Sequence, residues 1–182
     1  MEKLTTVGID LAKDVIAVCV LDRHGAAIEA DRPYAEQRWR QSIDVAEKCA
    51  CALERARTLL EMGRRLGDRS LVEKARDTFS QVGAKVYLAS ALHALAQLDA
   101  RSGAGATDAL RRYDQAIAAL EEVKANYELG VACAECARLQ LRMDQHEEAR
   151  SNFAKALALF KGIGAAVEQG ELQRELTTFA PV

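Results

Sequence analysis

The chain contains 182 residues, of which 49% are hydrophobic, and it carries a formal net charge of −2. This length suits one ordinary domain or one short solenoid, and so small a charge excludes bulk positive charge as a means of binding nucleic acid. Aromatic residues make up only 5% of the chain and there are two prolines, which favours closely packed helices over a sheet-rich fold.

No apolar run approaches the ~20 residues needed to cross a bilayer. The N-terminus also lacks the basic and unbroken apolar regions of a signal peptide. We therefore expect a cytoplasmic protein with no membrane partner. The five cysteines are odd in number, and we expect them to be reduced thiols.

The first thirty residues are rich in β-branched and apolar types. Residues 5–12, 15–21 and 26–30 form three such runs, with a turn at residues 23–25 between the second and the third. The pattern predicts a small antiparallel β-meander. Its open edge could pair with a second copy of the chain, which would make the N-terminal strands an oligomerisation device.

A resemblance to a known family follows from residues 6–13, which read T-V-G-I-D-L-A-K, together with Val18, Asp22 and Gly25. This stretch resembles the start of insertion-sequence transposases whose nuclease domain is RNase H-like with a DEDD acidic set. The resemblance implies that Asp10 would bind a divalent metal. Nothing after Asp31 continues the acidic pattern, and a lone strand carboxylate does not hold two metal ions.

Asp31 and Pro33 mark a boundary, since aspartate can cap a helix and proline suits the first helical turn. We therefore divide the chain into an N-terminal fragment, residues 1–32, and a helical domain, residues 33–182. The next stretch is either one long helix or two helices that meet at an unmarked joint, because no glycine or proline occurs before Gly63. Its apolar positions are Trp39, Ile43, Ala46, Ala50, Leu53 and Leu60.

Three helix-turn-helix units then share one pattern of apolar and small residues. The positions are Leu59, Met62, Gly63, Ala75, Phe79 and Val82 in the first unit; Leu92, Leu95, Ala96, Ala109, Tyr113 and Ala116 in the second; and Cys133, Cys136, Ala137, Ala149, Phe153 and Ala156 in the third. The pattern resembles the tetratricopeptide repeat over about the last two thirds of the chain. Ala75 and Ala109 lie 34 residues apart, the period of that repeat.

Helix ends and joints are predicted from local signals. Ser70 with Glu73 and Asp144 with Glu147 have the spacing of capping boxes, and Thr107 or Asp108 is expected to cap the helix after a glycine-rich loop. Matching joints are expected at residues 83–84, 124–125 and 164–165, and the first helix of the first unit at residues 53–66. A polar last helix, residues 167–178, would cap the array.

The expected fold is therefore mainly α, a TPR-like helical-repeat solenoid of about three units plus a capping helix, with a short N-terminal β-meander. In such a solenoid the first helices line a concave groove. The positions that would face it include Arg57, Arg64, His93, Gln97, Arg101, Arg138 and Arg142. They form either a solvated helix face or a basic stripe that binds a peptide carrying carboxylates or a C-terminal carboxylate.

Cys133 and Cys136 form a C-x2-C pair, but a closed zinc site needs four ligands and no second pair is present, so we expect packing instead. Cys49 and Cys51 are expected on different helix faces and not as a pair. The three histidines have no nucleophile at a motif spacing, and no phosphate-binding or dinucleotide motif occurs. We expect no catalytic site and no cofactor.

We expect a non-enzymatic scaffold that binds a protein or peptide partner through the groove. The repeats also resemble C-terminal segments of large bacterial signalling proteins, so the chain could be a piece of one. The alternative is an accessory or truncated nucleic-acid-processing protein, in which Asp10 works with acidic residues from another chain. Only that alternative needs a divalent metal.

Overall fold

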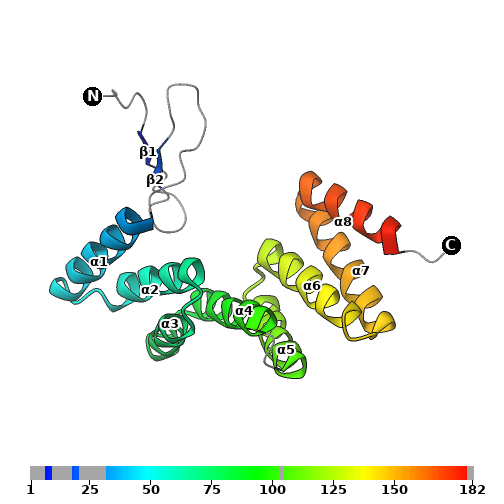
Figure 1. The fold of residues 1–182 in the computed structure, drawn as a ribbon, viewed down its shortest axis with the longest axis horizontal. Helices are drawn as coiled ribbons and strands as arrows, with labels where there is room; N and C mark the ends of the chain where they lie inside the picture. Colours follow the sequence, from blue (N-terminus) through cyan, green and yellow to red (C-terminus); the bar gives the residue numbers. More distant parts are fainter. Residues whose placement is uncertain (1–6, 10–17, 21–31, 103–104, 180–182) are drawn as a thin grey trace. The chain divides into compact units, whose positions relative to one another are not determined.

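The computed structural model describes residues 7–9, 18–20, 32–102 and 105–179, and helices dominate these residues (Figure 1). The prediction that the chain is helical after Pro33 is confirmed for the described residues. Their elements in chain order are β1 (Val7–Ile9), β2 (Val18–Val20), α1 (Arg32–Lys48), α2 (Ala52–Leu66), α3 (Arg69–Gln81), α4 (Lys85–Ser102), α5 (Ala106–Glu122), α6 (Asn126–Leu141), α7 (His146–Ile163) and α8 (Ala166–Phe179). Within this part of the chain, no helix combines the length and apolar character needed to span a bilayer.

The two strands pair antiparallel, with Val7 opposite Val20 and Ile9 opposite Val18. The expected third strand, residues 26–30, lies outside the described residues, and so does Asp10. The meander as a whole therefore stays a prediction.

The chain divides into two compact units, residues 1–78 and residues 79–182. In the first unit the stretch before Gly63 is two helices, α1 and α2, which pack against each other. Ala50 has a left-handed φ of 51° at the joint between them, so the helix ends although no glycine or proline stands there. The prediction that Cys49 and Cys51 occupy two faces of one helix is consequently wrong, because both lie in this joint.

In the described residues, six joints between helices share the same backbone geometry. In each, one residue has positive φ, and the amide of the following residue donates a hydrogen bond to the carbonyl five residues earlier, as Ala125 does to Leu120 at 3.1 Å. This arrangement satisfies a carbonyl that the ending helix would leave without a partner. The positive-φ residues are Ala50, Gly67, Gly83, Lys124, Asp144 and Gly164. The joints predicted at residues 83–84, 124–125 and 164–165 are confirmed.

The predicted Ser70–Glu73 capping box is wrong, because Asp68 caps α3. Its Oδ1 accepts hydrogen bonds from the Ser70 amide at 2.9 Å, from the Ser70 hydroxyl at 2.7 Å and from the Leu71 amide at 3.4 Å. The bond from the Ser70 hydroxyl is the main cause that lowers the pKa of the Asp68 carboxyl. Glu73 instead pairs with Arg69.

The other two predicted caps are also wrong. Asp144 is the left-handed residue of the joint, with φ 58°, and α7 begins two residues later at His146 after Gln145, with no side-chain cap. Likewise Gly105, with φ 86°, precedes α5, which begins at Ala106. In both places the backbone turn, and not a side-chain oxygen, sets the start of the helix.

Replacing Lys124 with glycine is expected to stabilise the protein by about 0.5–1 kcal/mol, because a left-handed conformation costs a residue with a Cβ roughly 1–2 kcal/mol and glycine far less. The matched control is Lys161→Gly, in the last turn of α7, where glycine should cost about 1 kcal/mol. Urea denaturation of both variants measures the difference. Equal destabilisation by the two substitutions would contradict the assigned role of Lys124.

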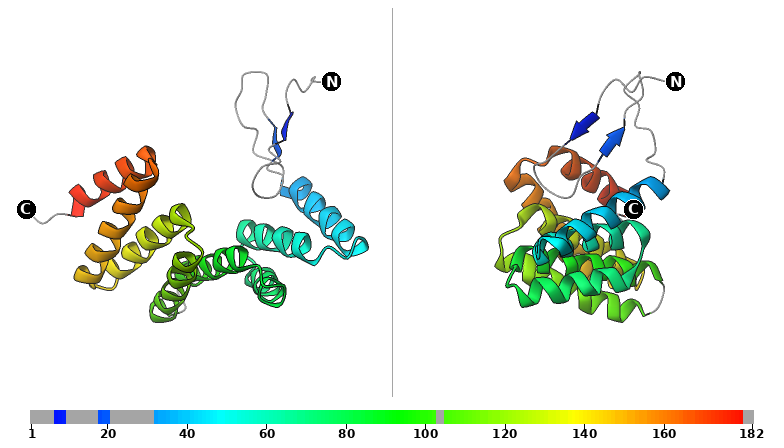
Figure 2. Two further views of the ribbon diagram at one scale, coloured as in Figure 1. Left: turned by 180° about the vertical axis from the view of Figure 1, so that it is seen from behind. Right: turned by 90° about the vertical axis from the view of Figure 1, so that its left-hand side faces the viewer.

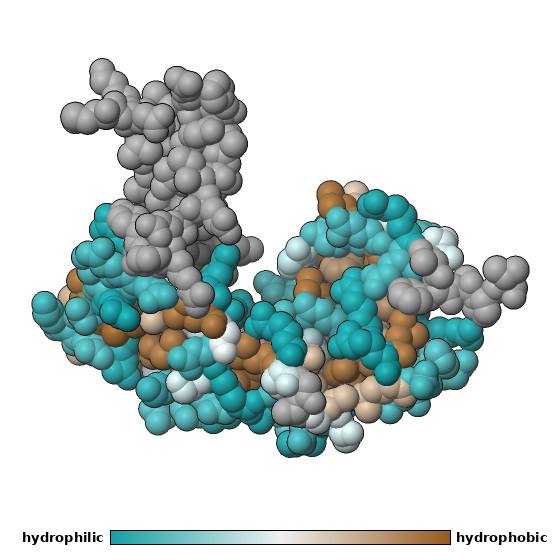
Figure 3. Space-filling view, viewed as in Figure 1, coloured by the Kyte–Doolittle hydropathy of each residue, from teal (hydrophilic) through white to brown (hydrophobic). Residues whose placement is uncertain are grey.

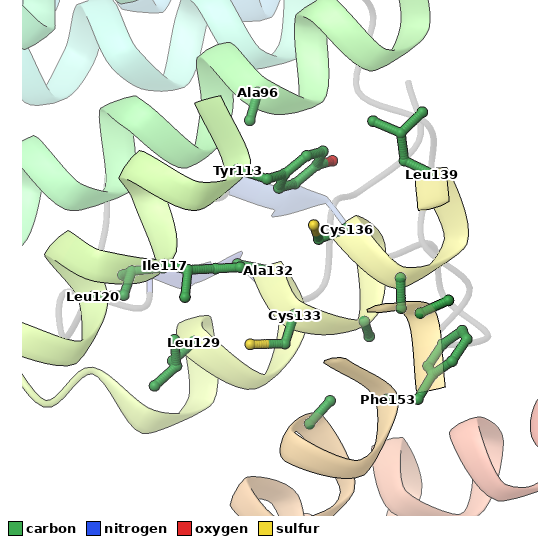
Figure 4. Close-up of a cluster of buried hydrophobic side chains, with 14 of the residues drawn as sticks. Ala96, Tyr113, Ile117, Leu120, Leu129, Ala132, Cys133, Cys136, Leu139 and Phe153 are labelled. Atoms are coloured by element: carbon green, nitrogen blue, oxygen red, sulfur yellow. The ribbon is translucent and has the colours of Figure 1, made fainter. Parts of the chain in front are cut away.

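The core of the second unit lies between α4, α5, α6 and α7 and is built largely from the repeat pattern (Figure 4). Tyr113 is 3% exposed and Phe153 is 2% exposed, and small residues around them are fully buried. Hydrophilic residues cover much of the outer surface in one view of the molecule (Figure 3). Val82 departs from the pattern of buried positions and is 48% exposed. It lies just after the short helix α3, which ends at Gln81.

Ala116 tests the register of this core, because it is fully buried on α5. The Ala116→Leu substitution adds volume at a close helix contact, so we expect it to destabilise the protein by about 1–3 kcal/mol. Ala118→Leu, at an exposed position of the same helix, is the control and should change stability by no more than about 0.5 kcal/mol. A thermal melt of Ala116→Leu that matches the parent would show that the register is wrong.

Candidate functional site

The seven residues predicted to line a groove fall in both units. Arg57 and Arg64 lie on α2 in the first unit, and both are partly buried. Arg57 donates a hydrogen bond of 3.0 Å to Glu54 on the same helix. The other five lie in the second unit: His93, Gln97 and Arg101 on α4, Arg138 on α6, and Arg142 directly after α6.

The Glu135 carboxylate, on α6, contacts several polar side chains of the second unit. Its carboxylate lies 2.7 Å from Nε2 of His93 and accepts hydrogen bonds of 3.0 and 3.1 Å from the Gln97 amide. The hydroxyl of Tyr113, on α5, donates to the same carboxylate at 3.3 Å. We call these four residues the Glu135 cluster. It joins α4, α5 and α6, which follow one another in the second unit (Figure 2).

The Glu135 cluster is partly buried: the side chain of His93 is only 6% exposed, and that of Glu135 is 26% exposed. Burial by itself raises the pKa of the Glu135 carboxyl, but the hydrogen bond and charge of His93 and the bonds from Gln97 and Tyr113 outweigh it and lower that pKa below its usual range. Burial and the neighbouring carboxylate raise the pKa of Tyr113. The cluster thus holds an ionised carboxylate and a neutral phenol at neutral pH.

Arg138 links α6 to α8 through a fork-shaped ion pair with Glu175. Its Nε donates to Glu175 Oε1 at 2.8 Å, and its Nη2 donates to Oε2 at 2.6 Å. The hydrogen bonds with Glu175 are the main cause that raises the pKa of the Arg138 guanidinium. The planar fork fixes the orientation of the guanidinium.

An open depression lies beside this ion pair, lined by Arg138, Leu141, Arg142 and Glu175. Arg142 is exposed at its rim, and Arg101 is exposed in the last turn of α4. The depression combines an apolar wall with two guanidinium groups and one carboxylate. Such a surface can accept a side chain or chain end that bears a carboxylate.

The sequence prediction missed the two carboxylates, Glu135 and Glu175, that the structure places against predicted groove residues. Each lies about one repeat away along the chain from a partner, since Glu135 follows His93 by 42 residues and Glu175 follows Arg138 by 37 residues. A search for opposite charges one repeat apart would have found the Arg138–Glu175 pair, whereas the polar partners of Glu135 carry no such signal. The face formed by α4, α6 and α8 is therefore mixed in charge and not simply basic.

A scan against protein-family models finds no match to this chain, and a search of curated proteins finds none either.

Cys133 and Cys136 lie on α6 in the core, where both are fully buried. In Figure 4 the Cys136 sulfur points toward Tyr113. Burial raises the pKa of Cys133 to about 11 and that of Cys136 to about 12, so both stay protonated thiols at neutral pH. Among the described residues, no group of three or more histidine, cysteine or acidic side chains could hold a metal ion. The buried position of Cys133 and Cys136 supports the interpretation that they pack in the core.

Proposed function

We propose that this chain is a non-enzymatic scaffold of the tetratricopeptide type that binds a protein or peptide partner. The proposal is supported by the backbone turn that recurs at six of the joints between helices in the described residues, and by the buried repeat positions. The binding face would be that of α4, α6 and α8 in the second unit. The cytoplasm and a bacterial signalling protein remain the proposed setting, on the sequence resemblance alone.

The observation that carries the proposal is the open depression lined by Arg138, Leu141 and Arg142. Elsewhere on this face, His93 and Gln97 are already engaged by Glu135. At the depression a guanidinium, that of Arg142, is exposed beside the apolar side chain of Leu141. The proposed partner is thus a peptide with a carboxylate side chain, or a C-terminal carboxylate, next to an apolar residue.

The proposal can be tested with fluorescently labelled peptides that end in an apolar residue and a free carboxylate, compared with the same peptides amidated at the C-terminus. Binding is measured by fluorescence anisotropy. Arg142→Ala and Arg138→Ala should each weaken binding of the carboxylate peptides by about 10- to 100-fold, since a charge-assisted hydrogen bond contributes about 1.5–3 kcal/mol. The affinity should also fall as salt rises, because the site is exposed.

The matched control is Arg150→Ala on α7, where the arginine is exposed and pairs with Glu147 on the same helix. This variant should bind as the parent does. Equal losses in all three variants would mean that only overall charge matters, and no preference for the free carboxylate would refute the site.

The second candidate function is nucleic-acid processing, favoured by the resemblance of residues 6–13 to transposases. Here Asp10, which follows Ile9 in the sequence, would act with acidic residues of another chain. Titration with Mn²⁺ in the presence of a DNA duplex, followed by calorimetry, should give metal binding that Asp10→Asn abolishes. Absence of binding in the parent would remove this candidate.

A further inference from the structure

The joint between α1 and α2 contains two cysteines that the proposed function does not use. Cys49 and Cys51 follow the last residue of α1 and precede the first residue of α2, and both are exposed. This contrasts with Cys133 and Cys136, which are buried within a helix.

The turn at Ala50 favours the short separation between the two cysteines that a local disulfide needs. Two consecutive Cα steps of 3.80 Å span at most about 7.6 Å, and a turn shortens this distance toward the 4.4–6.8 Å that a disulfide requires. Ala50 provides such a turn, with φ 51°. The Cys51 side chain points back toward Cys49, because its Sγ lies 3.5 Å from the carbonyl oxygen of Cys49.

The backbone hydrogen bonds and the ion pair that hold the joint do not involve the thiols, and the one thiol contact among the described residues here is the bond from Cys51 Sγ to the Cys49 carbonyl. The Cys51 amide donates to the Ala46 carbonyl at 2.8 Å, and the Cys49 amide donates to the Val45 carbonyl at 3.0 Å. Arg55 of α2 pairs with Glu47 of α1 at 3.1 Å across the joint. We therefore expect a bond between the two sulfurs to leave α1 and α2 in place.

We propose that Cys49 and Cys51 are a redox modification site. A low-molecular-weight disulfide such as oxidised glutathione oxidises the two thiols, and a disulfide forms between Cys49 and Cys51. The thiolate of one cysteine attacks a sulfur of the oxidant, breaking its S–S bond and releasing one glutathione thiol. The second cysteine then attacks the mixed disulfide, which forms the protein S–S bond and releases the second thiol. The protein loses two hydrogen atoms, and the oxidant is reduced to two thiols.

The test uses the full chain with Cys19→Ser, so that Cys49, Cys51, Cys133 and Cys136 are the remaining cysteines. The protein is equilibrated with mixtures of reduced and oxidised glutathione, quenched with acid and digested with trypsin. Both cysteines lie in one fragment, residues 49–55, between Lys48 and Arg55. We expect this fragment to lose two hydrogen atoms as the oxidant increases, with a matching loss of two free thiols per chain.

The variants Cys49→Ser and Cys51→Ser, in the same background, should lose this product completely and carry one glutathione on the remaining cysteine. Cys133 and Cys136 should stay unmodified throughout, and the helical circular dichroism should not change. Glutathione on both cysteines without a local disulfide would overturn the proposal. So would disulfide-linked dimers, no reaction, or loss of helix on oxidation.

Discussion

Replacing Phe160 with alanine is expected to lower the free energy of unfolding by about 3–5 kcal/mol, as for other buried phenylalanines. Phe160 lies on α7 and is 3% exposed. Its ring packs over Gly130 of α6 and meets the ring of Tyr127, with 6.1 Å between the ring centroids. Removal of the ring leaves a cavity between two helices that neither backbone can close. Chemical denaturation measures the loss.

A substitution at Gly130 tests the same contact from the other helix, α6. A Cβ at Gly130 would lie 2.7 Å from Cε1 of Phe160, so Gly130→Ala alone should destabilise the protein by about 1–3 kcal/mol. In the Phe160→Ala background that clash is gone, and the same change should be neutral or should stabilise by up to about 1 kcal/mol through helix propensity.

Gly170→Ala on α8 is the control, since no atom lies within 4 Å of the added Cβ, and it should not destabilise. Additive effects of Gly130→Ala and Phe160→Ala would contradict the packing described for α6 and α7.

Replacing Glu135 with alanine is expected to destabilise the protein by about 2–4 kcal/mol. The substitution leaves His93, Gln97 and the Tyr113 hydroxyl without the acceptor that now joins them, and each unsatisfied buried donor costs about 1–3 kcal/mol. We take a value below the sum because the Glu135 side chain is 26% exposed, so water can partly replace it. Glu128→Ala, exposed on the same helix, should change stability by no more than about 0.5 kcal/mol.

Glu135 also has a pH signature. Because the folded protein lowers the pKa of this carboxyl, its contribution is fully present above the carboxyl pKa of the unfolded chain. That contribution is lost as pH falls through the lower, folded pKa. The stability difference between the parent and Glu135→Gln should therefore shrink on acidification below the usual glutamate range. A difference that is constant from neutral to acidic pH would show that the carboxylate charge does not stabilise the cluster.

Regular spacing in the sequence was enough to predict the helices and most of their buried residues. Apolar and small residues recur at helical intervals, so positions such as Ala109 and Tyr113 were assigned to the core, where they lie. Joints at Gly67 and Gly164 could also be predicted, because glycine accepts the left-handed backbone at little cost. These signals are local, and each depends on residues within a few turns of one another.

Tertiary structure alone decided the features that depend on contacts across repeats or on backbone without a sequence marker. Ala50 and Asp144 adopt left-handed conformations without a glycine at either position. The joint at Ala50 was therefore not predicted, and Asp144 was wrongly predicted to cap α7. The predicted stripe is not simply basic, because Glu135 contacts His93 and Glu175 contacts Arg138. These contacts form only when the helices pack. Ionic partners about forty residues apart are brought together by helix packing, which the local hydrophobic pattern does not specify.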